Sequence, residues 1–97
     1  MNPHVLHNKE LSRYEIWLGE ERIGLVDYVD VNGELQITHT EVDPAHQGKN
    51  YAAILTREAL ADIDANNLGK VWPVCPYTVV YMKRHPDTHH LLSRELN

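Results

Sequence analysis

Apolar and polar positions alternate along the first half of the chain in a way that predicts β-strands. Residues 14–18 alternate and are rich in strand-favouring types, and residues 23–31 resume the pattern after a turn at 19–22. Asn32 and Gly33 then form the strongest short turn signal in the sequence, because both tolerate a positive φ. A third strand follows at 35–42. The pattern predicts an antiparallel meander of three strands, whereas the polar residues 4–13 indicate little.

The second half of the chain changes to helical spacing. Residues 51–66 carry an apolar stripe, and Asn-Leu-Gly at 67–69 is typical of a helix end. Residues 70–74 predict a fourth strand, parallel to the third because a helix intervenes. Pro73 lacks a ladder donor, which favours separation of these two strands. A second helix is predicted at 77–85, after Pro76, and a short terminal helix within 87–97.

The third predicted strand ends in two titratable side chains on its apolar face. Strict alternation places Leu35, Ile37, His39 and Glu41 on one face. Two interpretations stay open for the last two. Either the strand end frays and its side chains reach water, or the pair faces a cleft where burial tunes it for proton transfer. A β-bulge would exchange the two faces.

The segment between the third strand and the first helix has the features of a phosphate site. The N–H groups of a first helical turn lack intrahelical partners, and the helix dipole favours negative charge there. Lys49 adds a positive side chain. The loop lacks the glycine spacing of both common nucleotide-binding loops. A polar helix start without a ligand is the competing interpretation.

Cys75 precedes Pro76 and is therefore expected at or beside the N-cap of the second helix. That position lowers a thiol pKa, because the dipole and the free N–H groups favour the thiolate. The alternative is a small buried apolar residue, the usual role of a free cysteine. His89 and His90 lack the ligand spacing of a metal site, so we interpret them as part of a solvated tail.

Composition narrows the functional classes. The 97 residues allow one domain, and 42% hydrophobic residues argue against disorder. The single cysteine excludes an internal disulfide. The sequence lacks a membrane-length apolar run and a signal peptide, so we expect a cytoplasmic protein. The net charge of −5 argues against broad nucleic-acid binding.

Three segments together resemble a known family. They are His-Thr-Glu-Val at 39–42, the loop at 44–52, and Cys-Pro-Tyr at 75–77 with Tyr-Met-Lys-Arg-His-Pro at 81–86. Their order and spacing resemble the small YjdJ-type single-domain subgroup of the GCN5-related N-acetyltransferases, over about residues 10–87. The match departs at Asn50, where the subgroup favours Gly, but Asn is the non-Gly residue that best tolerates left-handed geometry. It also departs at Ala52, which the wider superfamily accepts.

The resemblance implies a compact α/β acetyltransferase fold in one domain over residues 1–97, with an antiparallel meander, a splayed parallel strand pair and two main helices. It implies that acetyl-CoA binds between the third and fourth strands. Tyr81 matches the tyrosine that protonates the departing thiolate, and Cys75 matches a candidate acyl acceptor. The candidate catalytic residues are Cys75, His39, Glu41 and Tyr81. The candidate cofactor-binding residues are Val42, Gln47, Gly48, Lys49, Asn50, Tyr51, Ala52, Ala53, Val74 and Pro76, and no metal is expected.

The expected activity is transfer of an acetyl group from acetyl-CoA to an amine, directly or through an acetylated Cys75. In the direct route, Glu41 or His39 takes the proton of the amine, and N–H groups near Val74 polarise the thioester carbonyl. The acidic surface suggests a cationic acceptor, either a small amine or a lysine-bearing protein. We expect a monomer without nucleic-acid or membrane partners. The alternative is a CoA-binding or protein-interaction module with little catalysis.

Overall fold

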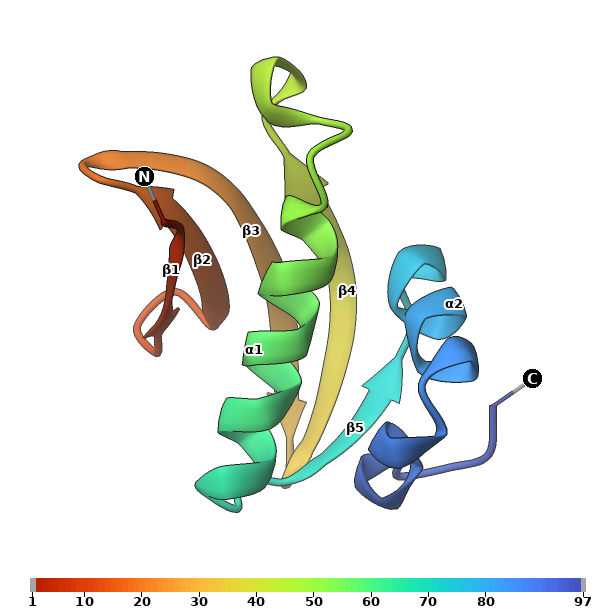
Figure 1. The fold of residues 1–97 in the computed structure, drawn as a ribbon. Helices are drawn as coiled ribbons and strands as arrows, with labels where there is room; N and C mark the ends of the chain where they lie inside the picture. The colour runs from red at the N-terminus through yellow and green to blue at the C-terminus, as the bar shows by residue number, and fades with distance from the viewer. Residues whose placement is uncertain (1, 97) are drawn as a thin grey trace.

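The computed structural model describes residues 2–96 and contains a five-stranded sheet, two α-helices and two short 3-10 helices (Figure 1). In chain order the elements are β1 (His4–Asn8), β2 (Arg13–Leu18), β3 (Glu21–Val31), β4 (Glu34–Val42), η1 (Pro44–His46), α1 (Tyr51–Ala65), β5 (Lys70–Pro73), α2 (Pro76–Arg84) and η2 (Pro86–Leu91). The predicted α/β fold, with its antiparallel meander and parallel strand pair, is confirmed.

The strands lie in sequence order, β1-β2-β3-β4-β5, and neighbours are antiparallel except β4 and β5. The turn between β3 and β4 has positive φ at Asn32 (53°) and Gly33 (88°), as its sequence predicts. Strand β1 extends the meander by one strand that the polar residues 4–13 did not predict. Its Val5 and His7 are partly covered, while His4 and Leu6 alternate with them toward solvent.

Helix α1 covers one face of the sheet (Figure 1). Its buried residues follow the predicted stripe and are Leu55, Thr56, Ala59, Leu60 and Ile63. They pack on a core that receives Tyr14 and Ile16 from β2, Ile23 and Val26 from β3, and Leu35 and Ile37 from β4. Each fully buried aliphatic side chain of this kind contributes about 1.5–3 kcal/mol to folding. The core thus fixes α1, and with it the loop that precedes the helix.

The predicted facing of the end of β4 is wrong. The pairing of β3 with β4 shifts between Asp27 and Tyr28, so that Asp27 pairs with His39 and Tyr28 with Ile37, and Thr38 is an extra residue on β4. A bulge of this kind exchanges the faces beyond it. Leu35 and Ile37 remain in the core, but His39 no longer shares their face.

Strands β4 and β5 separate where β5 ends. Their pairing runs from Glu34 with Lys70 to Ile37 with Pro73. The carbonyl of Ile37 then accepts hydrogen bonds from the N–H groups of both Val74 (2.9 Å) and Cys75 (2.8 Å). Beyond this point β4 continues to Val42 without β5, and the chain after β5 turns into α2. The separation expected near Pro73 therefore occurs there.

Candidate functional site

The loop before α1 presents free N–H groups at the helix start. Asn50 is the N-cap and is left-handed (φ 69°, ψ 14°), and Gly48 also has a positive φ of 79°. The first helical hydrogen bond runs from the N–H of Ile54 to the carbonyl of Asn50 at 3.1 Å. Within residues 2–96, the N–H groups of residues 48–53 find no acceptor. These groups and the helix dipole favour an anion.

The same loop is open enough for a phosphate to approach its backbone. A Cβ built on Gly48 would meet no atom within 4 Å. The side-chain amide of Gln47 donates to the carbonyl of Val42 at 3.0 Å and thereby ties the loop to the end of β4. A cavity of about 130 Å³ adjoins the loop and is lined by Val42, His46, Gln47, Gly48, Asn50, Tyr51, Ala52, Ala53 and Tyr77.

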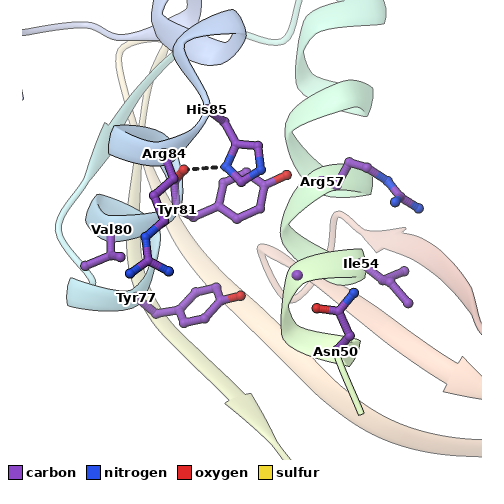
Figure 2. A pocket seen from close by; sticks show the side chains of 9 residues that line it. Asn50, Ile54, Arg57, Tyr77, Val80, Tyr81, Arg84 and His85 are labelled. Atoms are coloured by element: carbon purple, nitrogen blue, oxygen red, sulfur yellow. Dashed lines mark hydrogen bonds between the residues drawn. The ribbon is translucent and has the colours of Figure 1, made fainter. Parts of the chain in front are cut away.

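A larger cleft of about 400 Å³ lies between α1 and α2 (Figure 2). Each helix contributes residues at the same spacing of i, i+3, i+4 and i+7, which places them on one helical face. The set is Asn50, Ala53, Ile54 and Arg57 from the start of α1, and Tyr77, Val80, Tyr81 and Arg84 from α2, with His85 beyond. Tyr77 and Val80 are 39% and 46% exposed, so apolar surface lines the cleft. A partly apolar cleft with two cations suits a ligand with an apolar part and phosphates.

Tyr81 is the most deeply buried aromatic side chain of this cleft. Its ring stacks on His85 with centroids 3.9 Å apart, and Nδ1 of His85 donates to the Tyr81 carbonyl at 2.6 Å. The hydroxyl ends of Tyr77 and Tyr81 both point from α2 toward α1 (Figure 2). Burial raises the pKa of Tyr81, although the charge of Arg57 lowers it in part. Tyr81 is therefore held as a neutral phenol that is able to donate a proton.

Cys75 is the N-cap of α2, as predicted, and it is buried with 7% exposure. Its thiol donates to Oγ1 of Thr40, 3.6 Å away on β4. Burial raises the pKa of the Cys75 thiol, but the Thr40 hydrogen bond, the N–H groups of Thr78 and Tyr77 and the Thr78 hydroxyl outweigh it, so the pKa is lowered. The buried position and the lowered pKa, which the sequence offered as alternatives, occur together.

His39 and Glu41 lie apart from this cleft. Nε2 of His39 and Oε1 of Glu41 are 3.1 Å apart, and the two side chains are 57% and 53% exposed. Thr40, between them, points to the opposite face, where it meets Cys75. The pair therefore faces solvent on the other side of β4, as in the strand-end interpretation.

Comparison with known proteins connects this arrangement to one family. A family model described as GCN5-related N-acetyl-transferase matches residues 13–91, most of the chain. The chain belongs to the GCN5-related N-acetyltransferases. No functionally curated protein matches the sequence.

Solved structures of acetyltransferases share the fold of this chain. The ribosomal-protein-S18-alanine N-acetyltransferase of Escherichia coli has a TM-score of 0.61 at 10% identity, over 74% of this chain and 49% of that one. An IAA acetyltransferase from Bacillus cereus has a TM-score of 0.59 at 14% identity, over 86% of this chain and 73% of that one. A predicted acetyltransferase from Clostridium acetobutylicum, solved with acetyl-CoA, has a TM-score of 0.53 at 13% identity, over 75% of this chain and 55% of that one. The chain thus spans about half the length of the Escherichia coli enzyme.

Most predicted cofactor-binding residues gather near the loop, including Val42, Gln47, Gly48 and Asn50. The N–H groups of Val74 and Cys75, which were expected to help polarise a thioester, are both bonded to the Ile37 carbonyl in this structure. Pro76 forms the first residue of α2 beside Cys75.

Sequence reasoning missed six residues of the cleft, among them Arg57, Tyr77 and Arg84. Their signal is the shared spacing along two separate helices, which becomes meaningful only when the helices are known to face each other.

Within residues 2–96, no cluster of three or more His, Cys, Asp or Glu is placed to hold a metal ion. In the same part of the chain, no helix combines the length and apolar character needed to cross a membrane.

Proposed function

We propose that the chain binds acetyl-CoA and transfers its acetyl group to an amine. The observation that carries this proposal is the segment 48–53, whose unpartnered N–H groups open beside the cleft between α1 and α2. We assign the pyrophosphate to these N–H groups and to Lys49. Family membership supports the same ligand.

Acetyl-CoA would supply the acetyl group as an activated thioester. In the direct route an amine approaches from the sheet face that carries His39 and Glu41, and one of these side chains takes its proton through water. Tyr81, kept neutral by burial, protonates the leaving sulfur. This route needs no chemistry from Cys75.

In the second route the Cys75 thiolate first takes the acetyl group, and an amine then removes it. The lowered pKa of Cys75 supports this route. His39, which would deprotonate the acceptor, lies on the opposite face of β4, so the amine would have to reach the sulfur past the edge of that strand. We favour direct transfer, because it uses His39 and Glu41 on the face where they are exposed.

Mass spectrometry separates these possibilities. Products formed from a pool of amines and peptides with acetyl-CoA reveal the acceptor, and intact mass after incubation with acetyl-CoA reports an acetylated protein. An adduct that is absent in Cys75→Ala and discharged by an amine supports the two-step route. Full turnover by Cys75→Ala eliminates that route and leaves direct transfer.

A binding module with little catalysis is the second candidate. The observation that favours it is size, since the chain spans about half the length of the Escherichia coli enzyme and has fewer residues to shape an acceptor pocket. Tight acetyl-CoA binding measured by calorimetry, without turnover of any amine in the pool, would support this candidate over the enzyme.

A further inference from the structure

Thr78 carries a buried hydroxyl that has no hydrogen-bond partner. It is 1% exposed, and within residues 2–96 its Oγ1 makes no hydrogen bond. Buried hydroxyls are nearly always hydrogen-bonded, so this exception requires a physical reason. Thr78 is the third residue of α2, three positions after Cys75. An N-cap side chain lies near the third residue of its helix.

The sulfur of Cys75 is the acceptor that would complete this hydroxyl. As a thiol, Cys75 uses its only proton to donate to Thr40 Oγ1 at 3.6 Å, and Thr78 remains unpartnered. As a thiolate, the sulfur has no proton and accepts hydrogen bonds. The Thr40 hydroxyl on β4 can then donate its own proton to the sulfur, and the Thr78 hydroxyl can donate to the sulfur from α2. A thiol sulfur is only a weak acceptor, so both hydroxyls have a strong acceptor only in the ionised state.

We propose that Thr40 and Thr78 are positioning residues that hold Cys75 as a thiolate where β4 and α2 diverge. Thr40 comes from β4 and Thr78 from the first turn of α2, so the two hydroxyls approach the sulfur from the two elements beside it. The inference concerns the ionisation of the thiol, and it does not depend on acetyl transfer.

Hydrogen bonds rather than a neighbouring charge set this ionisation. Burial acts against the thiolate, and the groups that oppose burial are the Thr40 and Thr78 hydroxyls and the N–H groups of Tyr77 and Thr78. The titratable groups nearest to this site on the surrounding elements include Tyr77, Tyr81 and Arg84 on α2, Arg57 on α1, and His39 and Glu41 on the far face of β4. A cysteine paired with histidine, by contrast, is activated by the imidazolium charge.

The test is the pH dependence of alkylation by iodoacetamide, measured by intact mass. The chain has one cysteine, so every adduct reports Cys75. Thr78→Val and Thr40→Val keep the side-chain shape and remove the hydroxyl. We expect each to leave about tenfold less thiolate at a pH below both pKa values, because a hydrogen bond to a charged group is lost. Thr78→Ser should retain the wild-type pH profile.

Thr56→Val is the matched control. Thr56 is also buried in a helix, but its hydroxyl already donates to the Ala52 carbonyl at 2.8 Å. We expect this variant to alkylate with the wild-type pH profile. An unchanged profile in folded Thr78→Val would overturn the role of Thr78, and the same result in Thr40→Val would overturn that of Thr40. If circular dichroism shows that Thr78→Val unfolds, Thr78→Ser and Thr78→Ala are compared instead, and equal profiles in these two overturn the proposal. Acetyl-CoA is absent throughout, so failure of the proposed activity would not alter these outcomes.

Discussion

At the scale of single residues, Gly48 controls the conformation of the loop before α1. Its φ of 79° lies far from the value of about −65° that proline requires. Gly48→Pro should therefore distort the loop and also remove one N–H group from the site. We expect acetyl-CoA binding to weaken by about 3 kcal/mol or more, which is about a hundredfold or more in Kd. Calorimetry of both proteins tests this, and equal affinities would remove the loop from the binding site.

Asn50 allows a complementary test at the N-cap of α1. Its backbone is left-handed (φ 69°), and its side chain makes no capping hydrogen bond. Glycine adopts this conformation without the strain of a Cβ. Asn50→Gly should therefore keep or tighten the binding of acetyl-CoA, with a change in Kd of about fivefold at most. A large loss of affinity in calorimetry would mean that the Asn50 side chain itself contacts the ligand.

Residues governed by local geometry are predictable from this sequence, and those governed by strand pairing are not. The Cys-Pro step predicts the N-cap position of Cys75, and the tolerance of Asn for positive φ agrees with Asn50. His39 and Glu41 depend on the extra residue Thr38, which exists only relative to the partner strand β3. The sequence of β4 alone contains no local signal that predicts this bulge.

At the scale of elements, the cleft of this acidic protein is lined by two exposed cations. They are Arg57 on α1 and Arg84 on α2. If the cleft holds part of acetyl-CoA, reversal of either charge should weaken binding by about 1 kcal/mol, or about fivefold in Kd. Lys83→Glu is the matched control, because Lys83 neighbours Arg84 on α2 but does not line the cleft. Calorimetry at low and high salt tests this, and equal effects at Arg84 and Lys83 would indicate only a general charge effect.

A partly buried polar cluster joins α1 to the first three strands. Nε2 of His7 lies 2.7 Å from the Tyr28 hydroxyl, and the His7 ring stacks on Tyr14 at 4.2 Å. The Tyr14 hydroxyl donates to Asp62 of α1 at 2.6 Å, and Nδ1 of His7 lies 3.6 Å from the same carboxylate oxygen. Burial lowers the pKa of His7 from 6.5, although Asp62 raises it in part and Lys9 lowers it further.

This cluster predicts a loss of stability in mild acid. Because the folded-state pKa of His7 lies below its unfolded value of 6.5, the unfolded chain binds the proton first as the pH falls. The free energy of unfolding should decrease from pH 6.5 downward. His7→Gln should flatten this dependence and cost about 0.5–1.5 kcal/mol at pH 8 through the altered hydrogen bond. Urea unfolding at several pH values measures this, with His4→Gln on the exposed side of β1 as control. The same pH dependence in His7→Gln would contradict the assignment.

The loss of folding stability that comes from protonating carboxylates falls in a lower pH range. Burial raises the pKa of Glu15, but hydrogen bonds from Arg13, Asn8 and Trp17 outweigh it and hold the pKa below 4.5. The stability contributed by Glu15 is therefore present above 4.5 and is lost only as the pH falls below that value. A loss of stability between pH 6.5 and pH 4.5 therefore reports His7, because Glu15 contributes only below pH 4.5.

At the scale of the whole molecule, the apolar pattern predicts most of the sheet and both helices, because buried side chains recur at regular spacing along strands and helices. Strand β1 is missed because its faces do not divide into apolar and polar: Leu6 lies on the outward face and His7 on the inward face. The cleft is also missed, because it arises from the packing of α1 against α2 rather than from either sequence segment. Long-range packing is the common cause of both omissions.

Charge on the whole molecule leads to a prediction about the acceptor. The net charge is −5, and Asp27 and Glu41 flank His39 on the face from which we propose that the amine approaches. Opposite charge raises encounter rates, and salt screens it beyond about 8–10 Å. If transfer occurs, kcat/KM should fall with added salt for a polyamine or lysine peptide, but not for a neutral amine at the same concentrations.

Asp27→Asn tests how the negative charge close to His39 attracts the acceptor, and it does not alter a proposed proton acceptor. It should raise KM for the cationic amine, leave kcat nearly unchanged and reduce the salt dependence, because a rim charge acts mainly on encounter. Glu10→Gln removes one negative charge from the β1–β2 turn and serves as the control, since net charge changes equally while the local charge near His39 does not. Initial rates across a salt series measure both variants. If the two variants change KM and the salt slope equally, the overall charge rather than this face attracts the acceptor. If salt has no effect in the wild type, the cationic acceptor itself is wrong.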